Sequence, residues 1–251
     1  MGTWEIGDAA GEGRALEIQA LQRGIALGMT LIDTAEIYGH GRAEELVGQV
    51  INGLRDDVFV ASKVSPEHFG YDDLLRSCDS SIKRLRVKHI DLYQLHWPSS
   101  SVPIGETMRA MEELVARGKI RYIGVSNFSV AQTTKAREAL PRSEIVSNQV
   151  RYSLTHRAIE SQLLPFCEKE KLTIIAYSPL DSGRIPSGRI PKALLQHYAV
   201  TPAQLMLNWV TYNDMVVAIP KAANVEHVEK NAAAVDTRLS GDDYRTLSGA
   251  F

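Results

Sequence analysis

The sequence has few cysteines, no long apolar run and almost no net charge, and each of these shortages excludes a class of protein. Only Cys78 and Cys167 occur in 251 residues. Two cysteines so far apart provide neither a metal-ligand spacing nor a disulfide framework, which favours a reducing, cytoplasmic setting. The 28 Lys and Arg residues nearly balance the 30 Asp and Glu residues. A broad nucleic-acid surface or an anionic-membrane patch is therefore not expected.

Signals for membranes, secretion and the common nucleotide folds are also missing. No apolar run approaches the roughly 20 residues that cross a bilayer. The first residues, MGTWE, lack the basic and apolar regions of a signal peptide. Neither G-x-G-x-x-G nor a P-loop pattern occurs, so the usual nucleotide-binding fingerprints of open α/β sheets are absent. The glycine-rich residues 7–13 are expected to form a loop.

Strand-like apolar runs alternate with helix-like stripes along the whole chain. Seven apolar runs predict buried strands. They lie at residues 29–33, 58–63, 90–97, 120–125, 145–150, 172–177 and 215–219, and a short eighth strand is expected at residues 2–6. Helical spacing predicts helices around Leu21 and Met111 and at residues 44–51, 72–85, 131–140, 158–169, 203–210 and 225–235.

This alternation predicts one closed parallel sheet. Strict alternation of strand and helix is typical of a parallel α/β architecture. Eight units give about 31 residues each, a normal size for a βα unit. Eight units favour closure into a (β/α)8 TIM barrel. No linker or low-complexity stretch divides the chain, so a single domain over residues 1–251 is expected.

Polar residues stand where three successive predicted strands end. Asp33, Lys63 and His96 end or follow these strands, and Tyr38 lies just beyond the first. A charged residue at the end of a buried strand costs free energy unless it is paired or used in function. The carboxyl ends of barrel strands meet at one mouth, which is where barrel enzymes carry their active sites. An acid, a phenol, an amine and an imidazole are thus expected to converge.

These four groups suit proton transfer to a carbonyl oxygen during reduction by hydride. Tyrosine is a poor acid at its ordinary pKa of roughly 10. The ammonium of Lys63 is expected to lower the pKa of Tyr38, and Asp33 would hold Lys63 in position. His96 would orient the carbonyl with an N–H donor.

Each residue taken alone also has an ordinary structural explanation. Asp33 could cap the following turn, Tyr38 could be a loop aromatic, and His96 could be a hydrogen-bonded core histidine. Lys63 is harder to explain in this way, because lone lysines rarely end buried strands. The four together favour the functional interpretation.

Five segments are similar to the motifs of the aldo-keto reductase superfamily, in particular its short prokaryotic members. They are residues 31–39 (LIDTAEIYG), 95–98 (LHWP), 123–128 (IGVSNF), 176–180 (AYSPL) and 219–222 (IPKA). The similarity runs in order from Gly2 to about Asn231. It implies a (β/α)8 barrel and reversible NAD(P)H-dependent reduction of aldehydes and ketones. It also implies that Tyr38 is the general acid, supported by Asp33, Lys63 and His96.

The resemblance further implies a set of cofactor-binding residues. Ser126, Asn127 and Gln149 match the residues that hold the nicotinamide carboxamide, which needs side chains able to donate and accept. Tyr177 matches the aromatic residue that stacks on the nicotinamide ring. The matching positions along the pyrophosphate and around the adenosine are Ser178, Leu180, Ser182, Lys221, Ala222, His227 and Asn231. Among these, Lys221 matches the contact to the ribose 2′-phosphate.

Three positions around the adenosine depart from the family pattern. Ala222 stands where serine is common, His227 stands where arginine is common, and Lys230 replaces an acidic residue. Histidine is mostly neutral at pH 7 and lacks the guanidinium fork. We therefore expect NADPH to be preferred over NADH by a smaller margin than in relatives with serine and arginine, with NADH still usable. No metal is expected.

Both ends are short compared with the family pattern. The β-hairpin that plugs the barrel in relatives does not precede Gly2. Either the start was chosen downstream of the true one or the plug is missing, and a missing plug would expose apolar side chains at the barrel bottom. The chain stops at Phe251 without a long substrate-covering loop. An open, shallow pocket framed by Trp4, Trp97 and Phe128 is expected, with broad and weakly bound small carbonyl substrates. Nothing in the sequence indicates an oligomeric state.

Two other functions are compatible with the sequence. A cofactor-binding regulatory subunit resembling potassium-channel β subunits would share the barrel and the nucleotide site but act through a partner. An unrelated barrel lyase or isomerase would use Lys63 as a Schiff-base amine. The second alternative leaves Ser126, Asn127, Gln149 and Tyr177 without a task.

Overall fold

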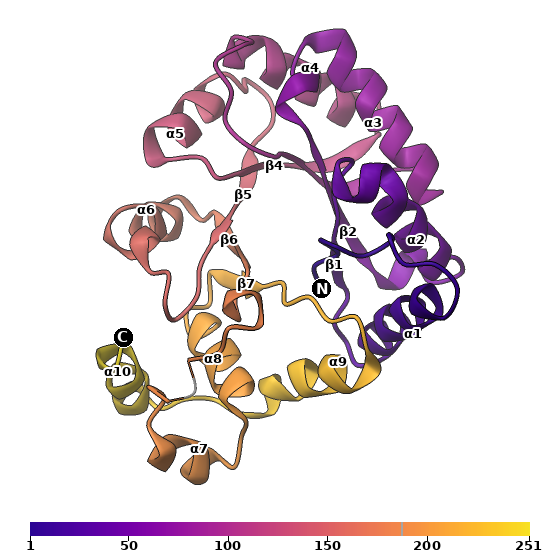
Figure 1. Cartoon of the computed structure of the whole chain (residues 1–251). Coiled ribbons are helices and arrows are strands. Elements are labelled where there is room, and N and C mark those ends of the chain that lie inside the picture. The colour runs from indigo at the N-terminus through magenta and orange to yellow at the C-terminus, as the bar shows by residue number, and fades with distance from the viewer. Residues whose placement is uncertain (187) are drawn as a thin grey trace.

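A curled sheet of parallel strands surrounded by helices makes up the computed structural model, which describes residues 1–186 and 188–251 (Figure 1). In these residues the sheet has seven strands, ordered as in the chain and each parallel to the next. The strands are β1 (Leu31–Asp33), β2 (Phe59–Val64), β3 (Ile90–Leu95), β4 (Ile120–Ser126), β5 (Ile145–Arg151), β6 (Thr173–Tyr177) and β7 (Val216–Ala218). All seven overlap the predicted strands, and the predicted (β/α)8 barrel is confirmed.

The predicted eighth strand at residues 2–6 is wrong in extent. Only Gly2 forms a β-bridge, which pairs it in parallel with Asp33. Gly2 N also donates to Pro220 O at 3.3 Å, so this short segment joins β1 to the chain that follows β7. The backbone then turns, because Ile6 N donates to Thr3 O at 3.0 Å and Glu5 adopts a left-handed φ of 58°. The contacts of Gly2 with Asp33 and with Pro220, rather than a full eighth strand, therefore close the cylinder.

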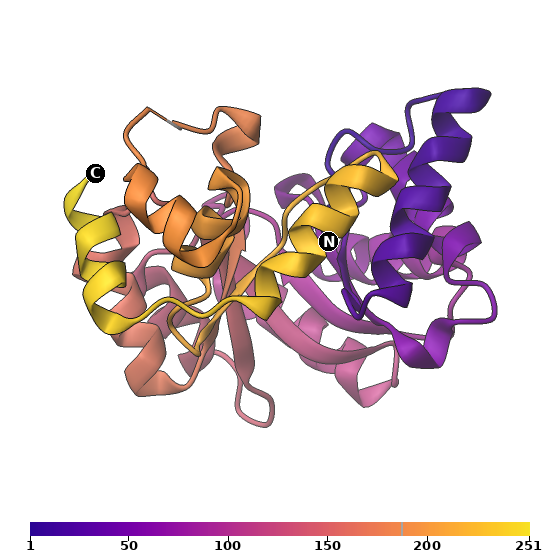
Figure 2. The ribbon, with the colours of Figure 1, turned by 90° about the horizontal axis from the view of Figure 1, so that it is seen from below.

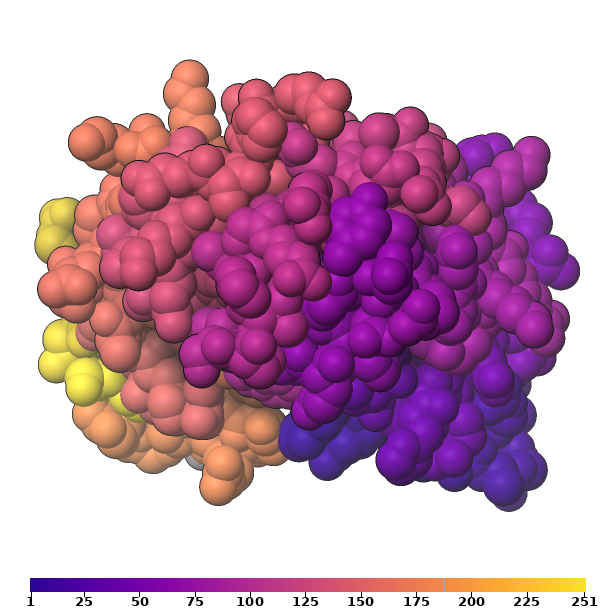
Figure 3. All heavy atoms as spheres, turned by 90° about the horizontal axis from the view of Figure 1, so that it is seen from above, coloured from indigo at the N-terminus to yellow at the C-terminus, as the bar shows by residue number. Residues whose placement is uncertain are grey.

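Helices cover the outside of the cylinder. Those in the described part of the chain are α1 (Glu12–Ala26), α2 (Arg42–Val50), α3 (Tyr71–Leu85), α4 (Ile104–Ala116), α5 (Val130–Glu138), α6 (Leu163–Glu170), α7 (Lys192–Tyr198), α8 (Pro202–Val210), α9 (Val225–Ala232) and α10 (Gly241–Gly249). The yellow α9 lies beside the indigo α1, where Arg23 pairs with Glu229 at 2.8 Å (Figure 2). Figure 3 shows the molecule from above, with indigo N-terminal atoms at the lower right and yellow C-terminal atoms at the left edge. The two ends of the chain thus complete the ring of helices.

The predicted helix at residues 158–169 is interrupted, and two helices were not predicted. Gln162 leaves the helical region, with φ −141° and ψ −51°, so a 3-10 turn (Ala158–Ser161) precedes α6. Pro165 then stands in the first turn of α6, where its missing N–H is tolerated. The unpredicted helices are α7 and α10. A signal for α10 was present, because Ser240 caps the N–H of Asp243 at 3.1 Å in an S-x-x-D pattern.

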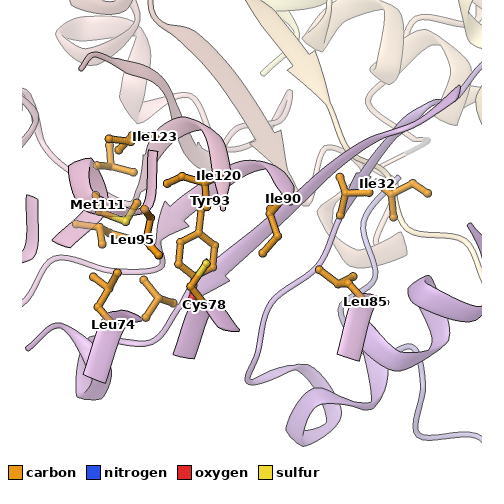
Figure 4. Close-up of a cluster of buried hydrophobic side chains, with 14 of the residues drawn as sticks. Ile32, Leu74, Cys78, Leu85, Ile90, Tyr93, Leu95, Met111, Ile120 and Ile123 are labelled. Carbon is orange, nitrogen blue, oxygen red and sulfur yellow. The ribbon is translucent and has the colours of Figure 1, made fainter. Parts of the chain in front are cut away.

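Apolar side chains from the strands pack against the helices in two large clusters. The first lies between β1–β5 and the helices of the N-terminal half, and Figure 4 shows Tyr93, Cys78 and Leu95 within it. The second lies between β5–β7 and the helices α6, α8 and α10. Strands buried on both faces explain why the sequence shows continuous apolar runs rather than alternation.

The barrel interior is apolar toward the amino ends of the strands. A third cluster includes Ala61, Leu92, Ile175 and Ile219. Below it, the rings of Phe59 and Tyr122 stack with 6.2 Å between their centroids. Tyr122 and Val217 are exposed at this end of the barrel. The polar groups lie at the opposite mouth, at the carboxyl ends of the strands.

No helix in the described part of the chain is both long and apolar enough to cross a membrane.

A close approach between α2 and α3 generates a stability prediction. A Cβ at Gly48 would lie 2.6 Å from Leu85 O and 2.7 Å from Arg84 O, which are backbone atoms that cannot rotate away. We expect Gly48→Ala to lower the free energy of unfolding by about 1–3 kcal/mol, as overpacking does elsewhere. The matched control is Gly105→Ala in α4, where a Cβ meets nothing within 4 Å. Urea unfolding of the two variants checks the prediction, and equal stabilities would contradict it.

Candidate active site

The carboxyl ends of β1, β2 and β3 bring together the four residues predicted to be catalytic. Asp33 is the last residue of β1, Lys63 lies near the end of β2, and His96 directly follows β3. Tyr38 begins a 3-10 turn (Tyr38–Gly41) and its N–H donates to Ala35 O at 3.1 Å. Because the strands are parallel neighbours, their ends deliver these side chains to one mouth.

Lys63 is the centre of this group. Its side chain is 0% exposed, and its Nζ donates to Asp33 Oδ1 at 2.6 Å, to Thr34 O at 2.9 Å and to Tyr38 OH at 3.2 Å. Burial alone would lower the pKa of Lys63, but the negative charge of Asp33 and the contact with Tyr38 raise it above its ordinary value. Lys63 is therefore held as an ammonium with all three of its hydrogens donated.

Tyr38 lies between the lysine and the histidine. The Nζ of Lys63 is 4.8 Å from the centroid of the Tyr38 ring, and the ring meets that of His96 edge-on at 5.6 Å. Burial raises the pKa of Tyr38, and the lowering effect of Lys63 does not offset it; Asp33 raises it further. The expected net lowering of this pKa is wrong, because the sequence pattern does not reveal how strongly the phenol is desolvated.

His96 is held as a neutral imidazole. It is 4% exposed, and its ring stacks on Trp97 with 3.7 Å between centroids. Burial and the nearby Lys63 lower the pKa of His96 to about 2. Its Nδ1 is buried without a hydrogen-bond partner among the described residues. A buried N–H without an acceptor is costly, so the proton belongs on Nε2, the nitrogen that borders the cleft.

Two glutamines hold the second oxygen of Asp33. Gln149 Nε2 donates to Asp33 Oδ2 at 2.7 Å, and Gln94 Nε2 approaches the same oxygen at 3.4 Å. Gln149 was predicted to hold nicotinamide, and this contact leaves its Oε1 to accept. Gln94 was missed by the sequence analysis. The available signal was an amide within the otherwise apolar run of β3, where it is fully buried.

Ser126, Asn127 and Tyr177 form a hydrogen-bonded group beside the glutamines. Ser126 Oγ donates to Gln149 O at 2.9 Å, and Asn127 Nδ2 donates to His96 O at 3.2 Å. Tyr177 OH donates to Asn127 Oδ1 at 3.0 Å. Asn127 adopts a left-handed φ of 61°, a conformation that asparagine tolerates better than most residues. The group links β4, β5 and β6 at the mouth.

The loop after β6 is anchored by Asp181, which the sequence analysis also missed. The buried carboxylate of Asp181 accepts from Ser153 Oγ at 2.8 Å and contacts His156 Nδ1 at 2.9 Å. It also holds the hydroxyl of Thr155. Asp181 itself has a left-handed φ of 50°. The loop that carries Ser178, Leu180 and Ser182 is thus tied to the chain that follows β5.

A cleft of about 1100 Å³ connects these groups. Most of the predicted site residues line it. They are Trp4, Asp33, Tyr38, His96, Trp97, Ser126, Asn127, Gln149, Tyr177, Ser178, Leu180, Ser182, Lys221, Ala222, His227 and Asn231. Lys63 lies buried beneath the lining residues. Glu5, Arg151 and Arg184 also line the cleft and were not predicted.

Phe128 is not part of the cleft wall. Its side chain is buried in the cluster between β1–β5 and the N-terminal helices, and its carbonyl oxygen accepts from Asn148 Nδ2 at 2.8 Å. The prediction that Phe128 frames the substrate pocket is therefore wrong. An apolar residue after a motif asparagine resembles a pocket residue in sequence, but here it points outward into the layer between sheet and helices.

Within residues 1–186 and 188–251, no group of three or more His, Cys, Asp or Glu side chains is arranged to hold a metal ion.

Comparison with known proteins identifies the family. The model of the Aldo/keto reductase family matches residues 1–250. The chain belongs to this family. The predicted resemblance is confirmed, and the protein is an oxidoreductase of the aldo-keto reductase type.

Several relatives match nearly the whole chain. The methylglyoxal reductase YeaE of Escherichia coli is 42% identical over 255 residues, covering 100% of this chain and 89% of its own length. A Klebsiella pneumoniae aldo/keto reductase, solved in complex with NADP and acetate, is 44% identical with a TM-score of 0.91, covering 99% of this chain and 89% of its own. The thermostable aldo-keto reductase Tm1743, solved with the inhibitor epalrestat, is 40% identical with a TM-score of 0.95, covering 100% and 94%.

The neutral state of His96 generates a prediction about pH. The pKa of His96 in the folded protein is about 2, far below the ordinary value of about 6.5. The unfolded chain therefore binds a proton that the folded protein does not, and stability falls as pH decreases below about 6.5. Between pH 7 and pH 5 we expect the wild type to lose about 2 kcal/mol more unfolding free energy than His96→Asn.

Denaturant unfolding at the two pH values measures this difference. His197→Asn, at an exposed position on α7, is the matched control and should follow the wild type. Equal losses in the wild type and in His96→Asn would mean that His96 is not buried as a neutral group.

Proposed function

We propose that the protein reduces aldehydes and ketones with NADPH, and that Tyr38 supplies the proton. The observation that carries the proposal is one buried ammonium in contact with both a carboxylate and a phenol at the mouth of the barrel. Lys63 Nζ lies 2.6 Å from Asp33 Oδ1 and 3.2 Å from Tyr38 OH. Buried ion pairs contribute little to stability compared with well-packed apolar residues, so their presence at a cleft points to function.

The donor set of the cleft fits a nicotinamide dinucleotide. Ser126, Asn127 and Gln149 offer hydroxyl and amide groups next to Tyr38, as a carboxamide requires. Tyr177 also lines the cleft and offers an aromatic face, and Lys221 lines the same cleft, where it would meet the 2′-phosphate at the adenosine end. When bound, the reduced nicotinamide would supply the hydride for the carbonyl carbon. The Klebsiella pneumoniae relative, which binds NADP, supports the same cofactor here.

A raised pKa suits Tyr38 to the reductive direction. A general acid must carry its proton when the reaction begins, and burial keeps the phenol of Tyr38 protonated at neutral pH. As negative charge develops on the substrate oxygen, that oxygen becomes basic enough to take the proton. The phenolate left behind then faces the ammonium of Lys63, which stabilises it.

His96 would orient the carbonyl group without competing for the proton. With the proton on Nε2, its neutral ring can donate a hydrogen bond into the cleft beside Tyr38. The pKa of about 2 means that His96 does not act as the acid itself. Stacking on Trp97 fixes the plane of the ring.

The state of Lys63 argues against a Schiff-base mechanism. A nucleophilic amine must lose a proton, yet Asp33 and Tyr38 raise the pKa of Lys63 despite its burial. Its three hydrogens are donated to Asp33, Thr34 and Tyr38, and its side chain is 0% exposed. The alternative of a lyase or isomerase therefore has no support in the geometry.

Small and reactive aldehydes are the substrate class that this cleft favours. Trp4 and Trp97 stand at its rim, 54% and 41% exposed, and Ile37 is exposed beside Tyr38. A rim so open gives few contacts to a small substrate, so we expect broad specificity and high KM. The similarity to a methylglyoxal reductase supports the same class. We further propose that residues 1–251 act as one catalytic domain in the cytoplasm.

Turnover with both cofactors tests the proposal directly. With methylglyoxal or nitrobenzaldehyde, we expect kcat/KM to be higher with NADPH than with NADH by on the order of tenfold, about the value of one charge-assisted contact. Oxidation of the cofactor is followed by absorbance. Equal or better turnover with NADH would overturn the cofactor assignment. Cofactor binding without turnover of any aldehyde would favour a regulatory subunit resembling potassium-channel β subunits.

Tyr38→Phe tests the assignment of the proton donor. The substitution removes the acid but none of the groups expected to hold the nucleotide. We expect the Kd for NADPH to stay near wild type and kcat to fall by roughly 10²–10⁴-fold. Nucleotide fluorescence and steady-state kinetics measure the two quantities. Tyr122→Phe, at the opposite end of the barrel, is the control; a fully active Tyr38→Phe would contradict the mechanism.

A further inference from the structure

Two lysines line the adenosine end of the cleft, and each is already paired with a carboxylate. Lys221 Nζ lies 3.5 Å from Glu5 Oε2, and Lys230 Nζ donates to Glu226 Oε1 at 2.5 Å. His227 lines the same end, and its backbone N–H donates to Asn224 Oδ1 at 2.8 Å. A third phosphate group would therefore enter a region whose positive charge is compensated.

Two arginines also line the cleft. They are Arg151 and Arg184, beside the loop that carries Ser178. Arg151 also has a carboxylate partner, because its Nη2 lies 3.8 Å from the buried Asp181 Oδ1, while its Nε is buried without a partner among the described residues. The cleft thus offers cations to the phosphates of either cofactor, and Glu5 is the carboxylate that stands against Lys221 itself.

Glu5 owes its position to the backbone that closes the barrel. Gly2 N donates to Pro220 O at 3.3 Å, which sets this segment directly against Lys221. The tight turn at Thr3, the left-handed φ of 58° at Glu5 and a hydrogen bond from Gly7 N to buried Glu17 Oε2 at 3.1 Å fix the chain on both sides. The carboxylate is carried to the cleft by a fixed loop.

We propose that Glu5 determines cofactor specificity by competing with the 2′-phosphate for Lys221, which narrows the preference for NADPH over NADH. The inference rests on the proposed function, in which Lys221 meets that phosphate. A carboxylate and a phosphate repel each other beside one ammonium, whereas a ribose 2′-hydroxyl can donate to a carboxylate. Glu5 therefore disfavours NADPH and tolerates NADH.

The pair is weak enough for a phosphate to displace it. Glu5 and Lys221 are 60% and 35% exposed, and exposed ion pairs contribute little to stability. Removing the charge of Glu5 should thus leave the fold intact and act on the nucleotide alone. Long-range repulsion by Glu5 would also act more strongly on NADP⁺, which carries the extra phosphate, but it would not depend on Lys221, whereas competition for Lys221 does.

Binding of the oxidised cofactors measures the effect of Glu5. The Kd values for NADP⁺ and NAD⁺ are measured by titration calorimetry for the wild type, for Glu5→Gln and for Glu5→Asn, in which asparagine tolerates the left-handed backbone. We expect both variants to bind NADP⁺ about three- to tenfold more tightly while the Kd for NAD⁺ is unchanged or weaker. Glu113→Gln is the matched control, because Glu113 lies on the distant α4 and pairs with Arg117 just beyond the end of that helix.

The route through Lys221 is tested in a second background. When Lys221→Gln is combined with Glu5→Gln, the gain in NADP⁺ affinity should shrink to less than half of its value alone. An unchanged ratio of the two Kd values in both Glu5 variants would overturn this inference while leaving the proposed function standing. Wild-type protein that binds neither dinucleotide would overturn the proposed function and this inference with it.

Discussion

The structure of the site depends on a single buried ammonium. Removing an ammonium from water costs several kcal/mol, and only close partners of opposite charge or good acceptor geometry offset that cost. Lys63 has three such partners, and two of them, Asp33 and Thr34, come from the end of β1. The parallel pairing of β1 with β2, which sets Asp33 beside Ala61, therefore determines whether the charge can be buried at all. The register of the barrel strands thus also fixes the ion pair on which the site depends.

The same ammonium sets the protonation state of its neighbours. It helps to hold His96 neutral, because a second positive charge so close would be repelled. It lies against Tyr38 without drawing off its proton, since burial of the phenol outweighs the attraction. Gln149 and Gln94 in turn hold Asp33 as the acceptor that balances the lysine. Two proton-bearing rings facing one cleft are the result, and both can donate to a substrate oxygen.

The sequence predicted those features that follow from strand ends. Asp33, Lys63 and His96 were found because a polar residue that ends a buried apolar run has few ordinary explanations. Tyr38 was found from its place just beyond the first of these strands, whereas the expected nucleotide contacts depended on resemblance to a family, since loop residues carry no periodic signal. Gln94 was missed because an amide within a strand resembles an ordinary interruption, and Phe128 was misassigned because sequence does not show which way a residue after a strand points. The direction of the Tyr38 pKa shift requires a degree of burial that no local pattern contains.

The residues proposed for proton transfer stand at strand ends, whereas those proposed to select the cofactor stand on loops and on α9. The proposed catalytic groups stand on or next to strands whose positions the barrel fixes, so altering one of them disturbs a buried network. The groups at the adenosine end stand on the turn at Glu5, on the segment after β7 and on α9, where side chains are exposed and single charges can change at little cost in stability. An ion pair such as that of Glu5 with Lys221 can therefore adjust which cofactor is held without affecting the proton donor. Because the two functions share a cleft but not a scaffold, a chain can keep the catalytic residues of its family while departing from it around the adenosine.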